Sequence, residues 1–131
     1  MSHTEDPTES RKKILAIDDE PDLLSFLQLV LEKGGYQPVT APNGTEGLIR
    51  AHVEQPELIL LDIMMEEMDG WETLRQLKAQ ESTRDIPVIV VSARNEPNSR
   101  ERALADGAVD FISKPFPVKE SLEKIASIVS S

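Results

Sequence analysis

The sequence predicts an α/β fold, a doubly wound parallel sheet of five strands that alternate with five helices. Five short apolar segments are separated by stretches of helical periodicity, and those that begin at Ile14, Leu58 and Val88 are nearly continuous rather than alternating. Continuous apolar strands are typical of a parallel sheet that helices cover on both faces. Five strand–helix alternations in 131 residues therefore predict right-handed βαβ units around one sheet.

The strands are predicted from the apolar segments themselves. These segments lie at residues 14–17, 36–40, 58–61, 86–91 and 109–112. The second of them is the weakest. Each is followed by a turn and then by residues at helical spacing, which is the repeat of a βαβ unit.

The helices are predicted from their apolar spacing and from their ends. They lie at residues 21–33, 43–55, 69–80, 97–106 and 118–129. The first helix has Pro21 in its first turn and is stopped by Gly34 and Gly35. The second opens with Asn43, a capping residue, and closes before Pro56.

The other three helices carry weaker end signals. The third places Trp71 and Leu74 on adjoining turns, and the fourth is short, rich in Ala and stopped by Gly107. The last has a single apolar stripe, which consists of Val118, Leu122, Ile125 and Val129.

Composition and charge restrict the class of function. Lys and Arg number 14 against 24 Asp and Glu, so the formal net charge is −10, which argues against direct nucleic-acid binding. The absence of Cys excludes disulfides and thiolate metal sites.

No apolar run is long enough to span a bilayer and no signal peptide is recognisable, so we expect a cytoplasmic protein that does not bind membranes. We expect residues 1–10 to form a disordered tail and residues 11–131 to form one domain.

Polar or charged side chains end four of the five predicted strands. Taken in strand order they are Asp18, Asp19 and Glu20, then Asp62, Ser92 and Lys114. The carboxyl ends of the strands in such a sheet meet at one edge, where ligands bind, so we expect these side chains to lie together. Each alone has an ordinary explanation, such as a helix cap at Asp18 or a solvated lysine at Lys114.

As a group, these residues suit phosphoryl chemistry. Asp18, Asp19 and Asp62 carry three negative charges and Lys114 carries one positive charge, so a divalent cation would neutralise the remainder. Oxygen ligands without His or Cys select a hard ion such as Mg²⁺. A carboxylate beside such an ion and a lysine can accept a phosphoryl group, whose oxygens would be bound by the ion, Lys114 and Ser92.

The same residues resemble the conserved positions of response-regulator receiver domains. The resemblance runs from about Lys12 to Val129 and is carried by the acidic pair Asp18-Asp19, by Asp62 in DIMMEEMDG, by Ser92 in VIVVSAR and by Lys114 in FISKPF. It implies a flavodoxin-like sheet with strand order 2-1-3-4-5. It also implies that Asp62 is the phosphoacceptor and that Lys114 and Ser92 assist it.

The resemblance further implies a metal site and a switch. Mg²⁺ (or Mn²⁺) would be held by Asp18, Asp19, Asp62 and the backbone carbonyl of Met64. The peptide bond between Lys114 and Pro115 is expected to be cis. After phosphorylation Ser92 would move toward the phosphoryl group and Phe111 would rotate inward, altering the surface formed by the helix from Pro97, the strand at residues 109–112 and the helix from Val118. The alternative is that Phe111 is a fixed core aromatic residue on the last strand.

Two further positions are expected to tune how long the phosphoryl group persists. They are Met64 and Arg94, which flank the phosphoryl group in this family. Glu66 stands where many receiver domains have Pro, and with Glu67 it adds two carboxylates, which are more simply solvated loop residues.

The expected function is a phosphorylation-controlled switch in a two-component His–Asp phosphorelay. A sensor histidine kinase or histidine phosphotransfer protein would donate the phosphoryl group, and a downstream protein would bind the altered surface. The chain would be a monomer or a dimer that forms on phosphorylation. It would not be an enzyme, because it would catalyse only its own phosphorylation and dephosphorylation. We expect a stand-alone, chemotaxis-regulator-like receiver; a receiver excised from a larger regulator or hybrid kinase is the alternative.

Other classes fit less well. A haloacid-dehalogenase-type enzyme needs a second acid where this chain has Met64. A flavin carrier would have its phosphate repelled by the acids after the first strand, and the P-loop NTPase motif is missing. The alternative left open is an interaction module of the same fold that phosphorylation does not regulate.

Overall fold

The computed structural model describes residues 11–65, 70–93 and 98–129. Along the chain the elements are β1 (Lys13–Ile17), α2 (Pro21–Lys33), β2 (Gln37–Ala41), α3 (Gly44–Glu54), β3 (Leu58–Asp62), α4 (Gly70–Ala79), β4 (Val88–Ala93), α5 (Ser99–Ala105), β5 (Asp110–Lys114) and α6 (Val118–Val129). The proposed N-terminal tail, residues 1–10, lies outside the described residues.

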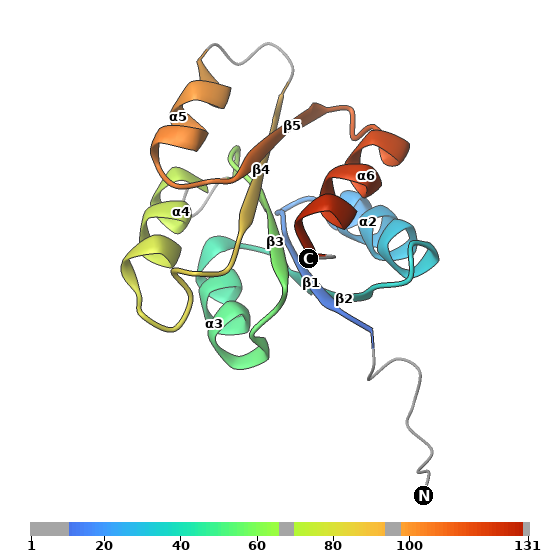
Figure 1. Ribbon diagram of the computed structural model, residues 1–131, viewed down its shortest axis with the longest axis horizontal. Helices are drawn as coiled ribbons and strands as arrows, with labels where there is room; N and C mark the ends of the chain where they lie inside the picture. The colour runs from blue at the N-terminus through green and yellow to red at the C-terminus, as the bar shows by residue number, and fades with distance from the viewer. Residues whose placement is uncertain (1–10, 66–69, 94–97, 130–131) are drawn as a thin grey trace, which may run out of the picture.

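The strands form one parallel sheet in the order β2-β1-β3-β4-β5, as expected (Figure 1). Helices α3, α4 and α5 cover one face of the sheet, and α2 and α6 cover the other. The chain adds β2 on one side of β1 and then returns to add β3 on the other side, so the strand order reverses between β1 and β3. That reversal is the place where doubly wound sheets bind ligands.

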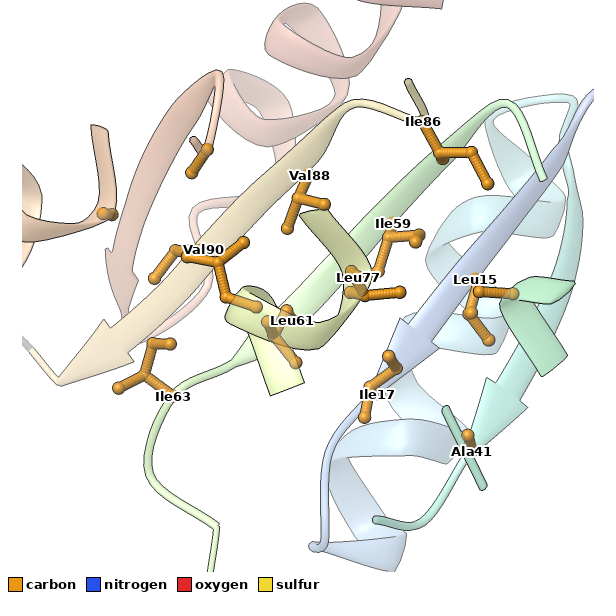
Figure 2. Packing of buried hydrophobic residues seen from close by; sticks show 14 of the residues in the cluster. Leu15, Ile17, Ala41, Ile59, Leu61, Ile63, Leu77, Ile86, Val88 and Val90 are labelled. Carbon is orange, nitrogen blue, oxygen red and sulfur yellow. The ribbon is translucent and has the colours of Figure 1, made fainter. Parts of the chain in front are cut away.

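Each face of the sheet has its own hydrophobic core. The core under α3, α4 and α5 includes Leu15, Ile59 and Leu61 on one face of the sheet and Leu77 of the covering helix α4 (Figure 2). The core under α2 and α6 takes the alternate strand residues, including Ile14 and Leu60. Because both faces are buried, all five residues of β3 are inaccessible, which explains why this strand reads as a continuous apolar run.

Helix ends follow the local signals in the sequence. Asn43 caps α3, because its side chain accepts a hydrogen bond of 2.8 Å from the backbone N–H of Glu46. Helix α5 ends before Gly107, whose φ of +107° lies in the region that favours glycine. No helix within the described ranges is long and apolar enough to cross a membrane.

Candidate functional site

Three charged side chains from three strand ends meet at the carboxyl edge of the sheet. Asp62 ends β3, Asp18 directly follows β1, and Lys114 ends β5. The Nζ of Lys114 lies 3.1 Å from Oδ2 of Asp62 and 3.7 Å from Oδ2 of Asp18. Both aspartates are 2% exposed. The predicted convergence of these residues on one edge is therefore observed in the structure.

Local backbone hydrogen bonds orient both carboxylates. Oδ1 of Asp18 accepts a bond of 2.9 Å from the N–H of Glu20, and Oδ1 of Asp62 accepts one of 2.9 Å from the N–H of Met64. In each case the bond spans two residues and uses one carboxylate oxygen, so the other oxygen faces Lys114. The two acids are thus fixed by the turns that follow their own strands.

The loop after Asp62 is held by a close approach of helix α4. A Cβ on Gly70 would lie 2.3 Å from the Cα of Ile63, so only glycine fits at this position. The N–H of Gly70 donates to the carbonyl of Ile63 at 3.1 Å. The start of α4 therefore packs directly on the backbone beside Asp62.

The electrostatics of the cluster are unbalanced in favour of negative charge. Burial, aided by the charge of Asp62, raises the pKa of Asp18 from 3.8 to about 7, although the N–H of Glu20 and the Lys114 ammonium act against it. For Lys114, burial lowers the pKa, but the carboxylates of Asp62 and Asp18 outweigh burial and raise it above its ordinary value. The cluster thus keeps its lysine charged and favours a proton, or another cation, on Asp18.

The residues present fit a hard divalent ion. Asp18, Glu20 and Asp62 each offer a carboxylate oxygen, and the three oxygens lie within 4.8 Å of one another. An all-oxygen set of this size suits Mg²⁺, which keeps several of its waters when bound by proteins. Asp19, expected as a ligand, is half-buried and is not a member of this group of three.

Glu20 is expected from the sequence at this edge of the sheet, but it is not among the predicted metal ligands. Its backbone is extended, with φ −96° and ψ 112°, and successive side chains of extended backbone point in opposite directions. The two-residue spacing from Asp18 to Glu20 was the available signal. Glu20 is the third carboxylate of the observed group, and its Oε1 lies 3.5 Å from Nζ of Lys114.

Ser92 supplies a hydroxyl without a hydrogen-bond partner. The residue lies in β4, is fully buried, and its Oγ has no partner among the described residues. A buried donor left unpaired costs about 1–3 kcal/mol, so it favours the arrival of an acceptor. A phosphoryl oxygen is an acceptor of the required kind.

The structure also describes three other features predicted at the site, a cis peptide bond and the positions of Phe111 and Met64. The Lys114–Pro115 peptide bond is cis, as expected. Phe111 in β5 is half-buried against the core under α3, α4 and α5, and Met64 is 55% exposed beside Asp62. Arg94 lies outside the described residues, as do Glu66 and Glu67.

A cavity of about 310 Å³ opens on the surface that was predicted to switch. Arg100 of α5, Phe111 of β5 and Glu120 of α6 are among the residues that line it. Beside it, Lys124 pairs with Asp110 at 3.2 Å. The cavity also reaches Lys114, so one wall is continuous with the acidic site.

Comparison with known proteins agrees with this geometry. A family model described as the response regulator receiver domain matches residues 14–126. The chain is 37% identical over 118 residues to the alkaline phosphatase synthesis transcriptional regulatory protein PhoP of Bacillus subtilis, covering 90% of this chain and 48% of that protein. The chain is also 37% identical over 118 residues to the phosphate regulon transcriptional regulatory protein PhoB of Escherichia coli. This match covers 90% of this chain and 52% of PhoB. The chain thus spans about half the length of the curated relatives it matches.

Among solved structures, the chain resembles the receiver domain of the sensor histidine kinase PA1611 from Pseudomonas aeruginosa. The TM-score is 0.84 at 26% identity, with 93% of this chain and 100% of that one covered. That structure holds a magnesium ion in its active-site cleft. With the strand order, the acidic edge and the family match together, the chain belongs to the family of response regulator receiver domains of two-component signal transduction systems.

Proposed function

We propose that this receiver domain is a switch controlled by phosphorylation of Asp62. The observation that carries the proposal is the buried Asp62 carboxylate with the Lys114 ammonium 3.1 Å away, held at the edge where the strand order reverses. The phosphoryl donor would be a sensor histidine kinase or a histidine phosphotransfer protein, in the cytoplasm. As proposed, the chain catalyses only its own phosphorylation and dephosphorylation.

Residues of the chain have distinct roles in this reaction. A carboxylate oxygen of Asp62 attacks phosphorus, the bond between phosphorus and the donor's imidazole nitrogen breaks, and the nitrogen keeps the electron pair. The ammonium of Lys114 binds one phosphoryl oxygen, and the unpartnered hydroxyl of Ser92 donates to another. A Mg²⁺ or Mn²⁺ ion held by Asp18, Asp19 and Asp62, with the Met64 carbonyl, would supply further charge neutralisation.

The switch would follow from the movement of Ser92. As its hydroxyl turns toward the phosphoryl group, space opens for the half-buried ring of Phe111. The rotation would change the surface of α5, β5 and α6 around the 310 Å³ cavity, where a downstream protein or a second copy of the chain would bind. Met64 and Arg94 would set how long the phosphoryl group persists.

The test is covalent modification of the intact chain. Incubation with acetyl phosphate and Mg²⁺, followed by intact mass measurement, should add one phosphoryl group to the wild type and none to an Asp62→Asn variant. An Asp22→Asn variant, which removes a nearby charge outside the cluster, should be phosphorylated like the wild type. If the wild type gains no mass, the chain is instead an interaction module that phosphorylation does not regulate.

A further inference from the structure

Glu20 occupies the N-cap position of helix α2 without acting as a cap. Its side chain makes no capping hydrogen bond. Helix N-caps favour Ser, Thr, Asp and Asn, whose short side chains reach the first backbone N–H groups of the helix. The longer side chain of Glu20 instead reaches Lys114, with Oε1 3.5 Å from Nζ. The carboxylate is therefore directed at the site rather than at the helix.

Lys114 has both buried and exposed acidic partners. Asp62 and Asp18 have side chains only 2–3% exposed, whereas the Glu20 side chain is 64% exposed. Glu20 and Lys114 both line a cavity of about 480 Å³ on the outer side of the cluster. Their contact thus lies at the mouth of the site, and the buried contacts lie inside it.

A divalent ion on the buried carboxylates would change this balance. Once their charge is neutralised, Asp62 and Asp18 attract the ammonium more weakly. A lysine side chain has about 2 kcal/mol of rotamer entropy, so an ammonium without a partner would leave its place. With the ion on Asp18, Asp19 and Asp62, as proposed above, the exposed Glu20 is the acid left beside the ammonium.

We propose that Glu20 is a positioning residue that keeps the Lys114 ammonium at the mouth of the site when the buried carboxylates are neutralised. Lys114 is then ready to bind a phosphoryl oxygen on arrival. This role rests on the proposed function, because it concerns the lysine that would receive the phosphoryl group. Glu20 acts through Lys114 and does not itself touch the reacting atoms.

Three variants separate the reach of Glu20 from its charge. Glu20→Asp keeps the charge, but the shorter side chain at an N-cap would bond to the first N–H groups of α2 instead of reaching Lys114. Glu20→Gln removes the charge and keeps the length. Asp22→Asn removes a charge in the first turn of α2. It is a matched control because, in the described part of the chain, Lys114 pairs only with Asp18, Glu20 and Asp62.

The first measurement is the Lys114 ammonium signal in a proton–nitrogen NMR spectrum, which persists only when the ammonium is shielded from exchange with water. Without Mg²⁺ we expect the signal in all four proteins, because Asp62 holds the lysine. With saturating Mg²⁺ we expect it to persist in the wild type and Asp22→Asn and to be lost in Glu20→Asp and Glu20→Gln. Persistence in Glu20→Asp, or loss in the wild type, would overturn the proposal.

The second measurement separates rate from ion affinity. With a small phosphoryl donor and saturating Mg²⁺, both Glu20 variants should lower the maximal phosphorylation rate about two- to fivefold, the range of an exposed ion pair. Asp22→Asn should leave that rate unchanged. Equal rates in all four proteins would contradict the role of Glu20. A wild type that takes up no phosphoryl group would refute the proposed function, and the NMR result would still decide whether Glu20 positions Lys114.

Discussion

Each buried acid of the site divides its two oxygens between the backbone and Lys114. Asp18 and Asp62 both give Oδ1 to a backbone N–H and turn Oδ2 toward Nζ. One ammonium cannot neutralise two buried carboxylates and the exposed Glu20 beside them. The raised pKa of Asp18 shows that, without a further cation, the site favours a proton there. Charge imbalance is thus built into the cluster.

The raised pKa of Asp18 predicts an unusual pH dependence of stability in the ion-free protein. Folding lifts this pKa from 3.8 to about 7, so the folded state binds the proton more tightly than the unfolded state. Stability contributed by Asp18 is therefore greatest near pH 4 and is lost as the pH rises toward 7. We expect urea unfolding in EDTA to show a loss of about 1–2 kcal/mol across this range that is absent in Asp18→Asn. Parallel curves for the two proteins would contradict this assignment.

Two buried serines offer a matched pair of substitutions. The Oγ atoms of Ser92 in β4 and Ser121 in α6 are both buried and lack partners among the described residues. Replacing either residue by Ala should raise the free energy of unfolding by about 1 kcal/mol, because an unsatisfied hydroxyl is removed. Only Ser92→Ala should also slow phosphoryl uptake at Asp62. Equal uptake in the two variants would mean that the Ser92 hydroxyl has no part in the reaction.

At the scale of elements, the bounds of a helix or strand were predicted correctly where the residues that begin and end it agreed with its pattern of burial. Helix α2 has the predicted bounds, because Pro21 begins it and Gly34 follows its last turn. The fifth strand was placed too early. Val109 is 48% exposed and precedes β5, whereas Lys114 belongs to the strand because its backbone pairs with Ala93. An apolar run does not record the hydrogen-bond register that decides where a strand ends.

Helix α5 is tied sideways to α4 by one cation–π contact. It has only seven residues, and the guanidinium of Arg102 lies 4.0 Å from the ring centroid of Trp71. We expect Arg102→Ala to destabilise α5 by about 0.5–1 kcal/mol, seen as faster hydrogen exchange of its amides. Asp106→Asn is the control, since it removes only the ion pair of Arg102 at 3.8 Å. Equal exchange in both variants would assign the effect to the ion pair instead.

At the scale of the whole molecule, the topology explains which parts of the site were predictable. Parallel strands end at one edge, so the convergence of Asp18, Asp62 and Lys114 follows from the fold class alone. The inclusion of Glu20 in the group of three carboxylates depends on the turn after β1. The unpaired hydroxyl of Ser92 depends on packing between strands. The spacing of residues in the sequence predicts neither the geometry of a turn nor a hydroxyl that lacks a hydrogen-bond partner.

The ends of the described chain are also joined across the molecule. Lys12, just before β1, donates a hydrogen bond through Nζ to the carbonyl of Val129, the last residue of α6. A cation at this position also compensates the negative end of the helix. The last helix is therefore tied to the start of the strand that Asp18 follows, and an ion bound at the acidic edge should stabilise the domain as one unit.

Binding of Mg²⁺ should therefore raise the free energy of unfolding of the entire domain. A ligand that binds only the folded state adds about 2.7 kcal/mol at a hundred times its Kd. The gain should persist in high salt, because ions at buried carboxylates are screened less than ions attracted by the net charge of −10. Asp62→Asn should abolish the gain, whereas Glu123→Gln on α6 should retain it. A gain that disappears in high salt, or that survives in Asp62→Asn, would show that Mg²⁺ acts on the general surface charge and that the buried carboxylates form no ion site.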